Sequence, residues 1–250
     1  MTDRRTQLRV WLLALDRFEL RLRGKIARQR GAFIIAASNT YELNASVPTW
    51  LLAAHKNKIA DILAAHYQAV IPYFGNMVLK QVKSRRISHK KASSLFSAFM
   101  LEWVKTESLS KATLISSTDS DDIRNAIQNS IESGVGIAEV ARDIRKVSSL
   151  TPFRAATVAR TETHNAATFG SVETARAAEQ DIGIVLMKEW LPTLDERTRE
   201  SHRAMAGKGA IELGARFEVD GESLDRPGDP SGSAGNIINC RCGIIYEEKQ

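Results

Sequence analysis

The sequence predicts an α+β protein in which a long helical N-terminal region precedes a small mixed domain. Apolar residues recur every three to four positions from the start of the chain to about residue 180, which is the period of amphipathic helices. From Ile184 to Trp190 the period falls to two, which is typical of a strand. We therefore expect the mixed domain to combine a central small-residue helix with a short antiparallel sheet.

Three helices are expected in the first half of the chain. The first, Leu8–Ile26, has arginines between its apolar positions. The second, Pro48–Lys80, begins with a residue that suits the first turn of a helix, and we expect Pro72 and Gly75 to kink or interrupt it. A third apolar run covers Leu95–Ile115. The N-terminal region should therefore be helical throughout.

The polar stretch Ser116–Asp122 has the composition of a helix start. Its side-chain oxygens can accept hydrogen bonds from free backbone amides, and acidic residues are favoured in a first turn. We place a domain boundary here, with a basic helical arm in residues 1–117 and an α+β domain in residues 118–250. A short helix, a turn at Gly134–Gly136 and a helix through Ile137–Ile144 should follow.

The central helix of the second domain is expected at Thr151–Gln180, ended by Gly183. It is rich in small residues that would let another element approach its backbone closely. They are Ala155, Ala159, Thr163, Ala166, Ala167, Gly170, Thr174 and Ala177. Further strands are expected around Arg216–Val219 and Ile237–Tyr246, whereas Asp220–Gly235 contains too much Gly and Pro for regular structure.

Charge is divided unevenly along the chain. Residues 1–91 hold 17 Lys and Arg against 5 Asp and Glu, whereas residues 92–250 hold 18 against 24. A positive lobe of this kind suggests a polyanion or an acidic protein face as its partner, although solvated helix faces are an alternative. The candidate contact residues are Arg17, Arg21, Arg23, Lys25, Arg28, Arg30, Lys83, Arg85 and Arg86.

Neither a membrane span nor a disulfide framework is expected. No apolar run approaches the roughly 18 to 20 residues needed to cross a bilayer, and Asp16, Arg17 and Glu19 interrupt the apolar run near the N-terminus. The two cysteines, Cys240 and Cys242, are too few for a framework and too close for an unstrained bridge. Synthesis in a reducing cytoplasm fits this pattern.

Four residues have the types and spacing of a metal site. Asp195 and His202 are seven positions apart, so two helical turns would place them on one face with Thr198 between them. Cys240 and Cys242 would share one face of a strand. If these elements pack together, His202 and the cysteines can bind a structural zinc ion, with Asp195 or water as fourth ligand. Alternatively, Asp195 is a helix N-cap and the others are ordinary buried residues.

No complete catalytic motif is present, so we do not expect an enzyme. The patterns of deaminases, zinc proteases, phosphate-binding loops and nucleophile elbows are all unmatched. Arg160 and Glu162 form either an active-site pair or a structural ion bridge. The alternative function is a metal-dependent nuclease or hydrolase, with His202 and the cysteines as ligands and Asp195 or Glu162 as base.

The chain contains three ordered strings, ARTETHNAATFGSVETAR, KEWLPTLDERTRESHRAMAG and PGDPSGSAGNIINCRC. Over roughly residues 120–246 they resemble the phage Mu F-like head morphogenesis family. The resemblance assigns no catalytic role to the matching positions. These positions are Arg160, Thr161, Glu162, Trp190, Asp195, Arg197, Thr198, His202, Gly207, Asn239, Cys240, Arg241 and Cys242.

This resemblance implies a minor capsid protein of a tailed bacteriophage, made in the host cytoplasm and oligomeric in the virion, inside the head near the portal. The implied partners are the portal and major capsid proteins, with phage double-stranded DNA as a further candidate for the basic arm. A protein that only binds DNA is less well supported, because the basic lobe has no known reading motif. Some family members are fused to toxin-like ADP-ribosyltransferase domains; with eight residues after Cys242, we expect none here.

Overall fold

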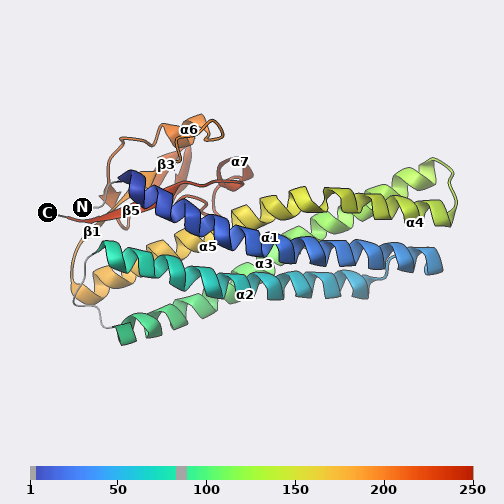
Figure 1. The fold of residues 1–250 in the computed structure, drawn as a ribbon, viewed down its shortest axis with the longest axis horizontal. Coiled ribbons are helices and arrows are strands. Elements are labelled where there is room, and N and C mark those ends of the chain that lie inside the picture. The colour runs from blue at the N-terminus through green and yellow to red at the C-terminus, as the bar shows by residue number, and fades with distance from the viewer. Residues whose placement is uncertain (1–3, 83–88, 250) are drawn as a thin grey trace. The chain divides into compact units, whose positions relative to one another are not determined.

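The computed structural model describes residues 4–82 and 89–249. It begins with helices α1 (Arg4–Asn44), α2 (Thr49–Gln81), α3 (His89–Glu132), α4 (Ile137–Lys146), the 3-10 helix η1 (Val147–Leu150) and α5 (Thr151–Ile182) (Figure 1). The rest contains strands β1 (Leu186–Leu191), β2 (Ile211–Glu212), β3 (Phe217–Val219), β4 (Glu222–Leu224) and β5 (Gly243–Glu248), with the one-turn helices α6 (Glu200–Arg203) and α7 (Ala234–Ile237). The predicted α+β class is therefore confirmed. None of the described helices is long and apolar enough to cross a membrane.

The chain forms two compact units, each built from several segments. Unit 1 contains Met1–Glu19, His66–Glu102 and Arg160–Gln250, and unit 2 contains Leu20–Ala65 and Trp103–Ala159. Each of the long helices α1, α2, α3 and α5 contributes residues to both units. The division of function at residue 117 is not tested by this arrangement and stays a prediction.

The predicted helix start at Ser116–Asp122 is wrong, because α3 runs through this stretch without a break. The hydroxyls of Ser116 and Ser120 donate to the carbonyl oxygens four residues earlier in the same helix. The carboxylate of Asp119 is buried against Arg30 of α1. These polar side chains are therefore satisfied inside a helix. The helix α2 likewise continues past Pro72, where an interruption was expected.

The sheet of unit 1 has β1 at its centre, paired antiparallel with β2 on one side and β5 on the other. Strands β3 and β4 form a separate hairpin whose loop is Asp220 and Gly221. Both loop residues have positive φ, at 55° and 74°, as a two-residue hairpin turn requires. The prediction that Asp220–Gly235 is irregular is therefore wrong at its start, where an Asp-Gly pair is the usual signal of a hairpin.

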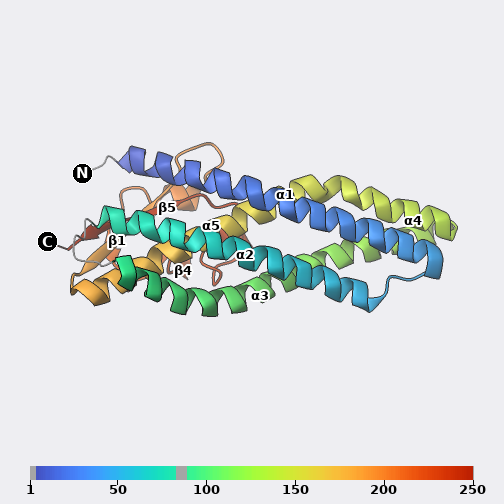
Figure 2. The ribbon, with the colours of Figure 1, turned by 60° about the horizontal axis from the view of Figure 1, so that its bottom comes forward.

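The core of unit 1 joins the sheet to parts of three helices. Its main apolar cluster consists of Val78, Val172, Ala175, Leu186, Leu213, Ile244 and Tyr246. In both ribbon views the start of α1 runs beside β5 (Figures 1 and 2). There Trp11 contacts Phe74 of α2 edge to face, with ring centroids 4.5 Å apart, and approaches Gly243 at the start of β5. The strand that follows the cysteines is therefore held by the helices.

Helices α2 and α5 approach each other closely at Gly170. A Cβ atom added there would lie 2.6 Å from the carbonyl oxygen of Ile71, far inside van der Waals contact. This confirms that the small residues of α5 allow a close backbone approach. We expect Gly170→Ala to lower the free energy of unfolding by about 1 to 3 kcal/mol, measured by chemical denaturation.

Gly31 in α1 provides the matched control, because a Cβ atom there would meet no described atom within 4 Å. Gly31→Ala should leave stability unchanged or raise it by up to about 1 kcal/mol, since Ala favours helix more than Gly does. Equal destabilisation by the two substitutions would contradict the close approach at Gly170.

The core of unit 2 lies between α1, α2, α3 and α4. It consists of Phe33, Ile34, Ala37, Tyr41, Leu51, Ile123, Val140 and Ile144. Beside it is a buried polar network in which Asp119 accepts hydrogen bonds from Arg30 Nε at 2.8 Å and contacts His55 Nε2 at 2.9 Å. The ring of His55 stacks on Phe33 with centroids 4.0 Å apart. The buried charges of Arg30 and Asp119 are therefore paired with each other.

Candidate functional site

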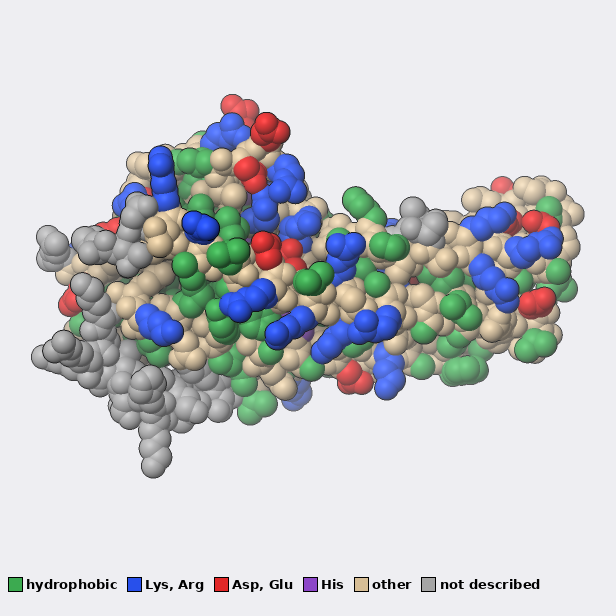
Figure 3. All heavy atoms as spheres, viewed as in Figure 1, with side chains coloured by type: hydrophobic (Ala, Val, Ile, Leu, Met, Phe, Trp, Pro, Cys, Tyr) green, Lys and Arg blue, Asp and Glu red, His purple; other side chains and the backbone are tan. Residues whose placement is uncertain are grey.

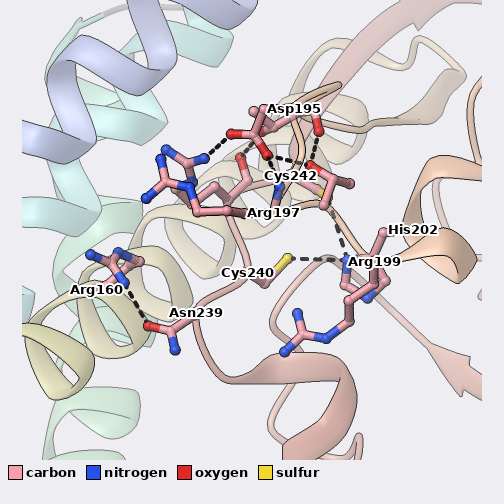
Figure 4. Close-up of a pocket in the computed structure, with 11 residues that line it drawn as sticks. Arg160, Asp195, Arg197, Arg199, His202, Asn239, Cys240 and Cys242 are labelled. Atoms are coloured by element: carbon pink, nitrogen blue, oxygen red, sulfur yellow. Dashed lines mark hydrogen bonds and ion pairs between the residues drawn. The ribbon is translucent and has the colours of Figure 1, made fainter. Parts of the chain in front are cut away.

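The candidate site is built from two loops of unit 1 that the sheet holds together. His202 lies on α6, and Cys240 and Cys242 lie between α7 and β5 (Figure 4). The two local structures predicted for these residues are wrong: between Asp195 and His202 the helix begins only at Glu200, and β5 starts one residue after Cys242. The pairing of β5 with β1 nevertheless brings the cysteines to His202.

The three side chains have the spacing of zinc ligands. Nδ1 of His202 lies 3.6 Å from Sγ of Cys240 and 3.5 Å from Sγ of Cys242, and all three atoms lie within 4.8 Å of one another. Tetrahedral zinc with ordinary Zn–N and Zn–S bond lengths separates nitrogen and sulfur by about 3.6 Å. All three residues are buried. They could therefore hold a metal ion.

The other ring nitrogen of His202, Nε2, makes a contact that orients the ring for metal binding through Nδ1. Nε2 lies 3.3 Å from Oδ1 of Asn236, to which it can donate. Trp190 contacts the same ring edge to face, with centroids 5.3 Å apart. Histidines that bind a metal commonly donate their other N–H to an oxygen, which fixes the ring. These contacts direct Nδ1 toward the two sulfur atoms.

The two thiols differ in acidity. The hydrogen bond from Cys240 and the contact with His202 hold the pKa of Cys242 well below its usual value, although burial opposes this. The same hydrogen bond, together with burial, raises the pKa of Cys240. Thiolate is the form that binds metals, so the contact of the cysteine pair with His202 favours the form that a metal site requires.

Asp195 lies outside this cluster, contrary to the prediction that it could be the fourth ligand. Its Oδ1 accepts hydrogen bonds at 3.0 Å from the backbone N–H of Arg197 and the hydroxyl of Thr198, and its Oδ2 is paired with Arg241. Burial opposes ionisation of Asp195, but the hydrogen bond from Thr198 and the charge of Arg241 outweigh it, so its pKa is lowered. Asp195 thus ties its loop to the segment that carries the cysteines.

Arg160 and Glu162 are held by different partners. Arg160 donates to Oδ1 of Asn239 at 2.8 Å, and its Nε lies 3.6 Å from a carboxylate oxygen of Glu19. Glu162 is buried and accepts a hydrogen bond from the hydroxyl of Tyr67 at 2.6 Å. Each residue therefore fixes α5 to a different element, which favours the structural interpretation over an active-site pair.

A pocket of about 330 Å3 opens beside the cluster. It is lined by Arg160, Thr193, Asp195, Arg197, Thr198, Arg199, His202, Asn239, Cys240, Arg241 and Cys242 (Figure 4). Sequence reasoning did not identify Arg199 or Thr193 as part of the site. The sequence pattern that could have identified Arg199 is its alternation with Arg197, two and four residues after Asp195.

The predicted basic contact residues on α1 are mostly exposed. Arg17, Arg21, Lys25 and Arg28 recur at helical spacing, and Figure 3 shows Lys and Arg side chains in a row over α1. Arg23 is exposed as well. Arg30 differs from expectation: it is only 2% exposed and paired with Asp119, so it cannot contact a surface partner. Lys83, Arg85 and Arg86 lie outside the described residues.

Residues 121–245 match the family described as phage Mu protein F like protein. The chain is 32% identical over 126 residues to the NAD(+)--arginine ADP-ribosyltransferase EFV of Enterococcus faecalis, and 30% identical over 126 residues to the minor head protein GP7 of Bacillus phage SPP1. Each alignment covers 50% of this chain, but only 25% of the first relative and 40% of the second. No solved structure matches the chain.

Proposed function

Because the chain belongs to the phage Mu protein F-like family, we propose that it is a minor head protein of a tailed bacteriophage, with a role in head morphogenesis. The observation that carries this proposal is the match over residues 121–245, which includes α5, the candidate metal ligands and all of the residues that line the pocket. The similarity to the SPP1 minor head protein supports it. The proposed location is the virion, inside the head near the portal.

We propose a structural role for this domain, although one relative is named as an ADP-ribosyltransferase. The alignment with that relative covers a quarter of its length. The carboxylate that lines the pocket, Asp195, is engaged by Arg241 and Thr198, which leaves it poorly suited to move a proton. The contacts of Asp195 thus favour a structural role, in which the residue holds two loops together, over a catalytic role.

A structural zinc ion is part of this proposal. His202, Cys240 and Cys242 would bind it, and the ion would join α6 to the segment before β5. This small region contains only short helices and strands, and the two cysteines belong to its apolar cluster. A metal link between two loops would stabilise such a region more than it would a large core.

A metal-dependent hydrolase or nuclease carried in the virion is the second candidate function. Its support is the pocket beside the three ligands, since a catalytic zinc keeps an open coordination position for substrate or water. Of the two bases considered from the sequence, Asp195 lines this pocket and Glu162 does not. Loss of a reaction without loss of folding, when the cysteines are replaced, would favour this function.

The exposed cations of α1 are the proposed attachment surface, with the portal or capsid proteins and packaged DNA as partners. We expect the triple variant Arg21→Gln, Lys25→Gln, Arg28→Gln to be depleted from purified heads, as measured by quantitative mass spectrometry. It should also bind duplex DNA more weakly, with the slope of log affinity against log salt falling by about three, because each cation that neutralises a phosphate releases about one counterion.

The matched control replaces three exposed cations elsewhere in unit 2, with Arg124→Gln, Arg142→Gln and Lys146→Gln. It removes the same charge and should be retained in heads. Absence of the wild-type chain from purified heads would overturn the proposed function. Equal depletion of the two triple variants would show that net charge, and not α1, determines attachment.

A further inference from the structure

We infer that the pocket beside His202, Cys240 and Cys242 binds a phosphate group. This goes beyond the proposed function, which places the contacts with partners on α1. The first observation is composition: among the residues that line this cavity of about 330 Å3, four are arginines and one is a carboxylate. The volume is at the lower end of the range for small-molecule sites and accommodates a phosphate with an attached group.

The charges in the pocket do not balance. Arg241 is paired with Asp195, and Arg160 lies 3.6 Å from Glu19. Within residues 4–82 and 89–249, neither Arg197 nor Arg199 forms an ion pair with a carboxylate. Two of the four arginines therefore carry a positive charge that no carboxylate partner offsets. A phosphate monoester, which carries about 1.5 to 2 negative charges at neutral pH, would neutralise this excess, whereas a single carboxylate would not.

The arginines come from three segments that surround one space. Arg160 is on α5, Arg197 and Arg199 are in the loop that leads to α6, and Arg241 lies between the cysteines (Figure 4). A guanidinium presents a planar fork of N–H donors that fits phosphate oxygens. Several such forks around one cavity can reach different oxygens of the same phosphate.

Two of these guanidinium groups are already held in place. Arg199 donates to the backbone oxygen of Ile238 at 2.6 Å, and Arg160 donates to the side chain of Asn239 at 2.8 Å. Asn239 itself is fixed in a turn with φ of 59°, and its backbone N–H donates to Thr161. Groups that are fixed before binding lose less conformational entropy when the ligand arrives.

This inference does not depend on bound metal. A zinc ion with one neutral histidine and two thiolates has no net charge, so the excess charge of the arginines remains with or without it. The zinc ion would be bound by His202 and the two cysteines, so none of the arginines would be one of its ligands. The phosphate can belong to a free phosphate compound, which brings up to about two negative charges on one group, or to a DNA backbone, which brings one negative charge on each successive phosphate.

The test is isothermal titration calorimetry of the full chain with inorganic phosphate. The double variant Arg197→Gln, Arg199→Gln should bind phosphate at least about tenfold more weakly, since each charge-assisted hydrogen bond is strong. The matched control, Arg5→Gln with Arg9→Gln, removes two exposed cations from α1 of the same unit and should change the affinity less than about twofold.

The single variant Arg197→Gln guards against a folding defect, because the Arg197 guanidinium makes no hydrogen bond within the described residues. It should also weaken phosphate binding while leaving the melting temperature unchanged. No phosphate binding by the wild-type chain, or equal losses in the pocket and control variants, would overturn the proposal. A parallel titration with a short DNA duplex identifies the source: reduced duplex affinity in the pocket variant indicates a DNA backbone, and unchanged duplex affinity indicates a free phosphate compound.

Discussion

Replacing Cys240 and Cys242 together with serine should remove bound zinc and lower the free energy of unfolding by about 4 kcal/mol or more. Loss of a metal is among the few changes that produce effects of this size. Both thiols are buried beside His202, and serine oxygen is a poorer zinc ligand than thiolate. Elemental analysis of the purified chain and chemical denaturation measure the two effects.

Met205→Leu is the control for a general packing defect. Met205 is buried in the same apolar cluster as the cysteines, and this near-isosteric exchange should cost less than about 1.5 kcal/mol and leave the metal bound. A chelator should lower the melting temperature of the wild-type chain to that of the cysteine variant and leave that variant unaffected. Loss of metal with unchanged stability would show that the ion is not structural.

The periodicity of the sequence predicted most helices because the long helices bury their apolar stripes. The boundary at residues 116–122 could not be predicted in the same way. Ser116 and Asp119 have the residue types of a helix start, and only the contact of Asp119 with Arg30, far away in the sequence, explains why the helix continues. The sequence shows which residues are polar, but not which partners satisfy them inside the fold.

The residue types predicted that His202, Cys240 and Cys242 lie together, whereas the local structure proposed for them was wrong. His202 and Cys242 meet because β5 pairs with β1, a contact between residues that are far apart in the sequence. The aspartate that helical spacing placed near His202 instead turns toward Arg241, 46 residues away. The sequence thus shows which side chains are able to bind a metal. Whether a given side chain, such as that of Asp195, binds a metal or forms an ion pair depends on tertiary contacts.

The substitution Asp119→Asn should lower the free energy of unfolding by about 3 to 5 kcal/mol, because it removes the nearest counter-charge of a buried arginine and leaves only Asp122, 3.9 Å away. Arg30 is 2% exposed, and its guanidinium approaches Oδ1 of Asp119 to 2.6 Å. The other carboxylate oxygen contacts His55 at 2.9 Å. Removing the carboxylate therefore affects two buried partners, and denaturant unfolding should detect the loss.

Two residues further along α3, Asp121→Asn provides the matched control. Asp121 is exposed and paired with Arg124, whose side chain is 70% exposed. Exposed ion pairs contribute little, so this variant should change stability by less than about 0.5 kcal/mol. A similar loss in both variants would mean that burial of the Arg30 network is not what stabilises unit 2.

The pH dependence of the free energy of unfolding, measured for the wild-type chain and for Asp119→Asn, tests whether the ionised form of Asp119 provides the stabilisation. Burial opposes its ionisation, but the hydrogen bonds from His55 and Arg30 outweigh this and lower its pKa from the usual 3.8. A carboxyl group with a lowered pKa stabilises the folded state above its unfolded pKa, and this contribution is lost as pH falls through the folded pKa. The difference between the wild-type chain and Asp119→Asn should therefore be largest above about pH 4 and shrink in acid. If the difference stayed constant across the acid range, the stabilisation would come from the shape of the side chain and not from its charge.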